Sequence, residues 1–271
     1  MENVTVICPY VFEGEIGRVK QGYWELPFMF ERDDSRIGSD LMFEKIWKQC
    51  DGDIIIFHAD MAHKEEDEPT LWFEELCDYA DKYPEAGLIG AKLLYPARND
   101  DEHFWIESAG GMFDSETNNP THFGSGLDME TQQFFKTPEA DTGQYDCVRE
   151  VAWTTFGGVY IRRKVIEDVG DFDRSFEWTY NRDVDYCLSA RKNGWKIYQV
   201  PTTIMHLQSQ DNKRVVTQEN RQSESRNLQR VKDKWQETEY WKTINKESQK
   251  AFEFLIENFK KNIEVFDTPS Y

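Results

Sequence analysis

The sequence predicts an α/β fold in which a mostly parallel central sheet is flanked by helices and followed by a C-terminal helical appendage. Apolar runs such as VTVICPY (residues 4 to 10) and DIIIFHADM (residues 53 to 61) have the composition of strands that are buried on both faces. Segments with apolar residues at helical spacing separate such runs, which is the order that βαβ units require.

The first fifty residues contain two predicted strands and one predicted helix. The first strand, residues 4 to 10, is followed by a segment (residues 11 to 26) that is short for a full crossover helix. PFMFERDDS then predicts a second strand that runs into a polar turn. Residues 36 to 50 predict an amphipathic helix, with Ser39 as its N-cap.

The next fifty residues repeat this alternation. The strand in DIIIFHADM ends in a polar triplet, His58 to Asp60, as strands do where ligands bind at the carboxyl ends of a parallel sheet. A helix is predicted from about Thr70 to Tyr83, and GLIGAKLLYP predicts a strand after it. Residues 98 to 148 are Gly-rich and polar, and their length favours a functional loop.

Residues 151 to 206 carry the strongest pattern in the chain. Paired glycines, Gly157 and Gly158, lead into a strand-like VYI and a short helix-like segment. DVDYCLSARKNGW then predicts a helix that begins near Asp183 and ends at Gly194. Two short β-type runs, KIYQV and TTIMH, lie on either side of Pro201.

The acids Asp183 and Asp185 begin this predicted helix. Acids at a helix N-terminus are favoured by the helix dipole, so a capping Asp with a solvated neighbour is one interpretation. Aromatic residues precede the acids, and His206 follows a strand about twenty residues later. This grouping favours a site between strand ends.

Six segments follow one another in this part of the chain: G-V-Y-I-R-R-K, V-G-D-F-D, R-D-V-D-Y-C, G-W-K-I, P and H. In this order they resemble the second half of inverting GT-A glycosyltransferases of family two, especially the rhamnosyltransferase-like members. In that family the acidic segment usually reads Glu-Asp-x-Asp, and the Asp after the Glu deprotonates the acceptor hydroxyl. That Asp matches Asp183, whereas Arg182 replaces the Glu. The resemblance covers roughly residues 50 to 235, and the first fifty residues are shorter than the family's usual nucleotide-binding half.

The resemblance implies a site for the donor and a divalent cation, Mn²⁺ or Mg²⁺. The place of the family's D-x-D motif is taken by His58-Ala59-Asp60, in the His-x-Asp form that some members have. Asp60 is the expected cation ligand, because hard cations take carboxylate oxygens together with substrate phosphates. His58 either contacts the diphosphate or packs, and His206 would match the histidine that closes the metal site.

The resemblance also implies the residues that contact the substrates. The base and ribose of the donor would lie against the following residues near the first two strand ends: Pro9, Tyr10, Glu13, Asp33 and Arg36. Asp34 is the alternative to Asp33, and an ordinary acidic turn explains both residues equally well. The acceptor would lie against Gly157, Gly158, Trp153 and Trp178. A UDP-sugar is the favoured donor, with dTDP- and GDP-sugars as alternatives, and the acceptor is a glycan or another hydroxyl compound.

Net charge, cysteine content and hydropathy indicate the kinds of partner and the location to expect. The net charge of −19 disfavours binding to nucleic acid or to an anionic membrane, while it suits a divalent cation. Five scattered cysteines without a C-x-x-C pair predict reduced thiols and a cytoplasmic location. No signal peptide pattern and no apolar run of about 20 residues is visible, so no transmembrane segment is expected.

The sequence therefore predicts a metal-dependent glycosyltransferase of the hexosyltransferase type. Residues 1 to 206 would form the catalytic domain, with a nucleotide-binding part to about residue 97 and an acceptor part from about residue 98. Residues 207 to 271 would form a mobile linker and C-terminal helices. Two alternatives remain: a sugar nucleotidyltransferase, although the glycine-rich phosphate loop it needs is not seen, and a noncatalytic carbohydrate-binding or scaffold protein.

Overall fold

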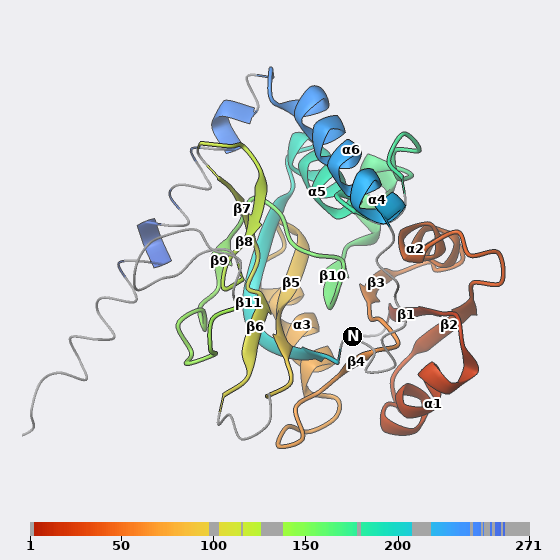
Figure 1. Ribbon diagram of the computed structural model, residues 1–271. Helices are drawn as coiled ribbons and strands as arrows, with labels where there is room; N and C mark the ends of the chain where they lie inside the picture. The colour runs from red at the N-terminus through yellow and green to blue at the C-terminus, as the bar shows by residue number, and fades with distance from the viewer. Residues whose placement is uncertain are drawn as a thin grey trace, which may run out of the picture.

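A mixed sheet of nine strands runs through the part of the chain that the computed structural model describes (Figure 1). The described residues are 3–97, 103–114, 116–125, 138–177, 180–207, 218–238, 241–244, 246, 250, 253–255 and 257. The sheet runs in the order β2 (Phe28–Arg32), β1 (Val4–Tyr10), β3 (Asp53–Ile56), β10 (Val159–Ile161), β5 (Ala86–Tyr95), β11 (Lys196–His206) and β4 (Met61–Ala62). Two strands pair beside this path, β6 (Trp105–Ser108) with β5 and β9 (Arg149–Glu150) with β11. A separate two-stranded sheet is formed by β7 (Gly111–Phe113) and β8 (Pro120–His122).

Most of the long strands are parallel, as predicted. Strands β2, β1 and β3 form one parallel group, and β5 and β11 form another. Strand β10 lies between the two groups and is antiparallel to both of its neighbours. The carboxyl ends of parallel strands share one edge of a sheet, so β3 and β11 deliver the residues that follow them to the same region.

Helices cover both faces of the sheet, because its central strands are apolar on both sides. One face packs against α1 (Glu13–Gly22) and α3 (Leu71–Lys82), and the other against α2 (Ser39–Trp47), α4 (Arg163–Val169), α5 (Arg182–Lys192) and α6 (Gln218–Trp235). In β3, Ile54 and Ile56 point to the core under α2, whereas Ile55 points to the core under α3. This alternation explains the unbroken apolar run.

Three local predictions are corrected by the structure. The segment after β1, predicted to be short for a full crossover helix, nevertheless connects the parallel strands β1 and β2 through the ten-residue helix α1. Helix α2 starts at Ser39, and its N-cap is Gly38 with φ 95°, so Ser39 is not the cap. The two β-type runs around Pro201 form one continuous strand, β11, whose pairing with β5 shifts register between Gln199 and Thr203.

The largest correction concerns the segment predicted as a mobile linker. Residues 218 to 235 form α6, which packs beside α5 (Figure 1). Its buried face is a stripe spaced four residues apart that consists of Ser223, Asn227, Val231 and Trp235. Half of this stripe is polar, so the segment lacks the apolar periodicity that predicts a packed helix.

Polar contacts hold α6 in place. The buried carboxylate of Asp185 accepts hydrogen bonds from Trp235 Nε1 at 2.8 Å and from Lys234 Nζ at 2.9 Å. The amide of Asn227 accepts a bond from the Glu177 backbone N–H at 2.9 Å and donates one to the Tyr180 carbonyl at 2.8 Å. Helix α6 therefore fixes the chain on both sides of the start of α5.

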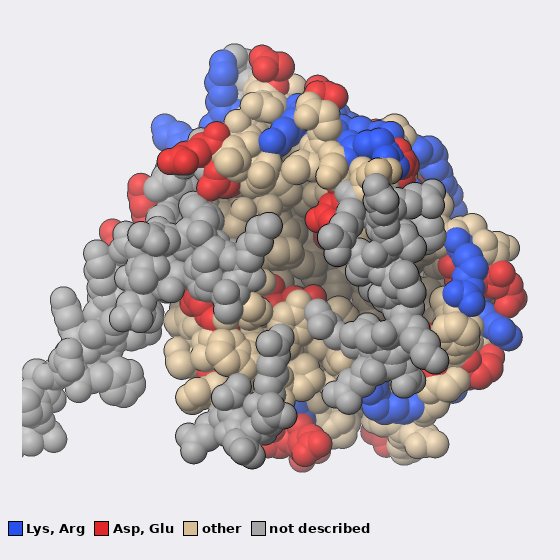
Figure 2. All heavy atoms as spheres, viewed as in Figure 1, with Lys and Arg blue, Asp and Glu red and all other residues tan. Residues whose placement is uncertain are grey.

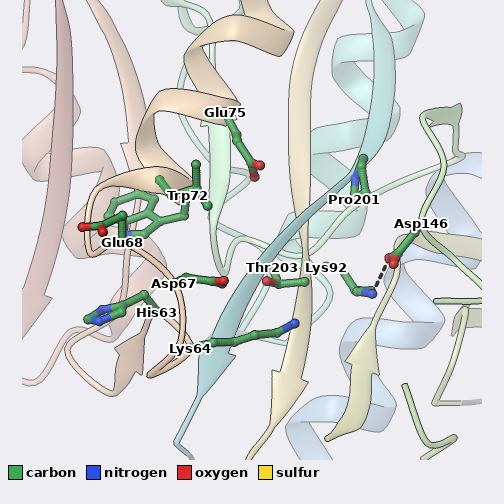
Figure 3. Close-up of a pocket in the computed structure, with 11 residues that line it drawn as sticks. His63, Lys64, Asp67, Glu68, Trp72, Glu75, Lys92, Asp146, Pro201 and Thr203 are labelled. Atoms are coloured by element: carbon green, nitrogen blue, oxygen red, sulfur yellow. Dashed lines mark hydrogen bonds and ion pairs between the residues drawn. The ribbon is translucent and has the colours of Figure 1, made fainter. Parts of the chain in front are cut away.

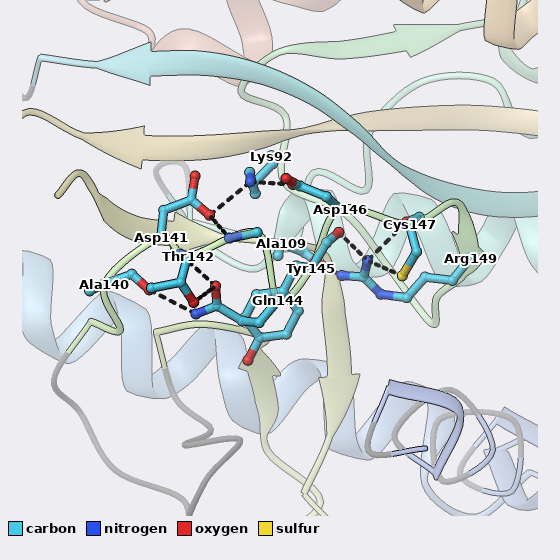
Figure 4. A network of polar contacts seen from close by, with 11 residues as sticks. Lys92, Ala109, Ala140, Asp141, Thr142, Gln144, Tyr145, Asp146, Cys147 and Arg149 are labelled. Carbon is cyan, nitrogen blue, oxygen red and sulfur yellow. Dashed lines mark hydrogen bonds and ion pairs between the residues drawn. The ribbon is translucent and has the colours of Figure 1, made fainter. Parts of the chain in front are cut away.

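Part of the long polar segment between β5 and β9 is also fixed by buried charges. Lys92, on β5, is 1% exposed, and its ammonium group binds Asp141 at 2.9 Å and also Asp146 (Figure 4). Arg149 donates to the carbonyl oxygens of Tyr145 and Cys147 in the same network. The described part of the segment predicted as a loop thus contains β6, β7 and β8 and is tied to the sheet.

Two further findings concern the cysteines and the helices. All five cysteines are free thiols, and all but Cys147 are buried. No helix within the described ranges is long and apolar enough to cross a bilayer.

The α5–α6 contact makes a prediction about stability. We expect Asp185→Ala to lower the free energy of unfolding by about 2 to 3 kcal/mol, because it removes the hydrogen bond from the buried Trp235 N–H and breaks the charged hydrogen bond from Lys234. Asp185→Asn keeps an oxygen for Trp235 and should cost less, about 1 kcal/mol. Urea unfolding monitored by circular dichroism measures both. An Asp185→Ala protein as stable as the wild type would contradict this role.

Candidate functional site

A pocket of about 180 Å³ lies where the post-β3 loop, the end of β11 and the start of α5 meet. Figure 2 shows a hollow near the centre of the face viewed in Figure 1, with carboxylate-bearing residues at its edge. The pocket is lined by Ser39, Asp40, His58, Asp60, Met61, Leu93, Glu107, Thr155, Phe156, Gly157, Asp183 and His206. Five of these were site candidates from the sequence: His58, Asp60, Gly157, Asp183 and His206.

His206 connects two carboxylates in the pocket. Its Nδ1 lies 2.6 Å from Glu107 Oε2, and its Nε2 lies 3.3 Å from Asp60 Oδ2. Burial opposes protonation of the imidazole, but the hydrogen bonds to Asp60 and Glu107 outweigh it and raise the pKa of His206 to about 10. The backbone assists this arrangement, because the N–H of Leu207 donates to the carbonyl of Asp60 at 2.8 Å.

Asp183 lies in the first turn of α5 and faces the same pocket. Burial raises the pKa of its carboxyl group to about 6, although a hydrogen bond from the Val184 N–H at 2.8 Å acts in the opposite direction. The neighbouring Arg182 is buried and donates to the Phe176 carbonyl. The predicted second acid, Asp185, is the anchor of α6 described above, so the two acids of this motif have different surroundings.

His58 lies in the pocket wall and also packs. Its Nε2 is 3.2 Å from the carbonyl oxygen of Phe156, and its ring meets Phe43 edge to face at 5.1 Å between centroids. Gly157 lines the pocket, and a Cβ at this position would lie 2.5 Å from Met61 Cε. A side chain at this position would therefore have to displace the flexible end of the Met61 side chain.

Two acids of the pocket were not among the sequence candidates. Asp40 is in the first turn of α2, where acids are common for reasons of helix dipole alone, so its position gave no distinctive pattern. Glu107 is on β6, inside the segment that was predicted as a loop. Only the pairing of β6 with β5 brings Glu107 beside His206.

The residues expected to bind the donor base lie at the ends of β1 and β2 and do not line this pocket. Tyr10 donates its hydroxyl to Glu13 at 2.9 Å, and Pro9 is buried in β1. Asp33 is buried and accepts backbone N–H groups of the turn before α2, both at 3.0 Å. The guanidinium of Arg36 lies over the Phe12 ring at 5.1 Å.

The other residues expected on the acceptor side have different positions. Trp153 is 2% exposed in the core, where its Nε1 donates to the Met112 carbonyl at 3.0 Å, and it does not line the pocket. Gly158 follows Gly157 with φ 62° and precedes β10. Trp178 lies outside the described residues.

The acids and histidines of the pocket are the candidate ligands for a divalent cation. Among the described residues, no three His, Cys, Asp or Glu side chains converge as a complete protein cage would require. A cation that is bound with a diphosphate needs only one or two protein ligands, since phosphate oxygens and water supply the others. The adjacent Asp60 and His206 side chains fit this smaller requirement once a cation replaces the proton on His206 Nε2, with a carboxylate oxygen and an imidazole nitrogen.

A second pocket, of about 200 Å³, lies on the α3 side of the sheet (Figure 3). Acids from the start of α3 and the loop before it, among them Asp67 and Glu75, face β11 across this pocket. The ammonium group of Lys92 at its edge is already paired with Asp146 (Figure 3). None of the site residues expected from the sequence lines this pocket.

Comparison with known proteins identifies the fold. The crystal structure of GalNAc-T7 with UDP, GalNAc and Mn²⁺ superposes with a TM-score of 0.57 and 12% sequence identity over 97% of this chain. The aligned region is 57% of the GalNAc-T7 chain, so this chain spans little more than half of that structure. The crystal structure of A197 from STIV is more distant, with a TM-score of 0.36, 11% identity and coverage of 76% of this chain and 82% of that one. No protein-family model and no curated protein sequence matches the chain. The chain therefore has the GT-A fold, as predicted.

Proposed function

We propose that this protein is a metal-dependent glycosyltransferase that moves a sugar from a nucleoside diphosphate to a hydroxyl group of a glycan or similar acceptor, with inversion at the anomeric carbon. The observation that supports this most is the meeting of Asp60, Asp183 and His206, distant in sequence, in one pocket of a GT-A fold. The pattern around Asp183 favours a family-two, rhamnosyltransferase-like enzyme. UDP is the favoured nucleotide, because the solved structure with this fold holds UDP.

Each group in the pocket has a role in this proposal. Asp60 and His206 would hold the cation, which when bound neutralises the leaving diphosphate. Glu107 orients the His206 imidazole through the 2.6 Å hydrogen bond. The acceptor oxygen attacks the anomeric carbon, its proton passes to the Asp183 carboxylate, and the bond from that carbon to the diphosphate oxygen breaks.

The charge of the pocket supports the need for a cation. No lysine or arginine is among the described residues that line it, whereas four carboxyl groups are. A diphosphate would meet strong repulsion there without a positive partner. Protonated His206 is already shared by Asp60 and Glu107, so it offers little free charge.

Binding of UDP should require the metal. Titration calorimetry of the purified protein with UDP should give heat of binding in MnCl₂ and none in EDTA, since the cation offsets the repulsion. Asp60→Asn should weaken UDP binding at least about tenfold, because it removes a charged ligand. Asp67→Asn, in the second pocket, is the control and should bind as the wild type does. A scaffold protein would show no metal-dependent heat, and that result would refute the proposal.

Loss of the base should separate binding from chemistry. We expect Asp183→Asn to reduce UDP release from UDP-sugars by about 10²- to 10⁴-fold, the usual contribution of a positioned base. Binding of UDP with Mn²⁺ should remain within about twofold, because Asp183 does not contact the diphosphate in this proposal. If the variant kept a tenth of the wild-type rate or more, Asp183 would not be the base.

The rate should also report the ionisation of Asp183. The base acts as a carboxylate, so with the pKa of Asp183 raised to about 6 by burial, the rate falls as the pH drops through 6. Above about pH 7 the rate should level off. The profile of kcat/KM for the acceptor is measured with saturating UDP-sugar and Mn²⁺ at each pH, because kcat/KM reports the ionisation of Asp183 before the acceptor binds. An acidic limb centred near the ordinary aspartate pKa of about 4 would argue against Asp183.

A further inference from the structure

Asp40 has hydrogen-bonding capacity that the described protein does not use. The residue is 5% exposed and contributes to the wall of the pocket that also contains Asp183. Its Oδ2 is buried and has no hydrogen-bond partner among the described residues. Leaving a buried polar group unsatisfied costs about 1 to 3 kcal/mol, so such an atom in a pocket wall indicates a ligand.

Helix capping does not account for Asp40. Helix α2 has no side-chain cap, and the N–H groups of Ile37 and Gly38 before it are bound by Asp33. Glu44, one turn further along the same helix, shows how a structural acid is satisfied here. The Glu44 side chain is also buried, but it accepts bonds from Lys48, Arg174 and the backbone N–H of Phe172.

The charges around Asp40 restrict the ligand that it can bind. Asp183 faces the same pocket, while the acids Asp60 and Glu107 are occupied by His206. Burial, together with the negative charge of Asp183, raises the pKa of Asp40 well above its ordinary value, and Arg182 opposes this only in part. A protonated carboxyl group both donates and accepts hydrogen bonds, as a sugar hydroxyl does. An anionic ligand would be repelled by the carboxylate of Asp183, which faces the same pocket.

We propose that Asp40 binds the acceptor: its carboxyl group hydrogen-bonds a second hydroxyl, next to the one that gives its proton to Asp183. The acceptor is then an uncharged sugar with two neighbouring free hydroxyl groups at the point of attachment. This inference rests on the proposed function and names the substrate class of the same site. Asp40 takes no part in bond making, so its contribution lies in affinity and orientation.

The test uses simple glycosides as acceptors. UDP release from UDP-sugars is measured with Mn²⁺ and methyl glycosides of neutral hexoses, their monodeoxy analogues and methyl glucuronides. Neutral glycosides should stimulate release, glucuronides should not, and one deoxy analogue should raise KM at least about tenfold, because it leaves the Asp40 carboxyl unpaired. The inference would be overturned if glucuronides stimulated UDP release as much as neutral glycosides do. It would also be overturned if no neutral glycoside stimulated UDP release.

Variants of Asp40 test whether its carboxyl group is the hydrogen-bond partner of the hydroxyl that the deoxy analogue lacks. Asp40→Ala should raise KM for the best glycoside by about the same factor as the deoxy analogue, and the two changes together should add little more. Asp40→Asn should restore most of the affinity, whereas Asp67→Asn should change nothing. The assignment would be contradicted if the substitution and the deoxy analogue together raised KM by the product of their separate factors, or if Asp40→Ala left KM unchanged.

Two further measurements distinguish a loss of acceptor binding from misfolding of the variant and from failure of the proposed function itself. The melting temperature of Asp40→Ala should equal or exceed that of the wild type, because the change removes an unsatisfied group. UDP binding with Mn²⁺ should stay within twofold. Wild-type protein that fails to bind UDP with Mn²⁺ would refute the glycosyltransferase itself, whereas normal UDP binding with an unaltered acceptor KM would refute Asp40 alone.

Discussion

The concentration of carboxyl groups in one pocket, with no lysine or arginine among its described lining residues, is the constraint on which the rest of the site depends. Ionised carboxylates cannot be packed together without compensation, and each acid here is relieved in a different way. Asp60 and Glu107 share the imidazole of His206, and Asp183 has a raised pKa. Asp40, the most deeply buried of the group, has its pKa raised well above its ordinary value by burial.

This balance gives the pocket two regions of different chemistry. In the proposed function, the Asp60–His206 region exchanges a proton for a cation and receives the diphosphate, whereas the region of Asp40 and Asp183 receives hydroxyl groups. A glycosyltransferase needs both regions next to each other, since the anomeric carbon lies between the leaving diphosphate and the attacking oxygen. The proposed function follows from this pairing more directly than from any single residue.

The framework around the pocket explains why residues so distant in sequence can meet. Strands β3 and β11 end at the same edge of the sheet, and β6 adds Glu107 through its pairing with β5. Helix α6 then holds both sides of the start of α5, through Asn227 and through the Asp185–Trp235 hydrogen bond. The position of Asp183 thus depends on a helix that contributes none of the residues lining the pocket.

The sequence by itself determined the parallel strands and the polar triplet after β3, because these depend on local apolar runs and on short patterns, and its resemblance to a known family implied the GT-A fold. It also identified Asp60, Asp183 and His206 as candidates. The tertiary structure alone decided that Trp153 is in the core, that Asp33 accepts hydrogen bonds from the backbone of the turn before α2, and that Asp40 and Glu107 line the pocket. The physical reason is that burial, and hence the pKa and the hydrogen-bonding partners of a carboxyl group, depend on neighbours from other elements. Helix α6 shows the same limit, since its buried stripe gains stability from specific polar contacts that hydrophobic periodicity does not record.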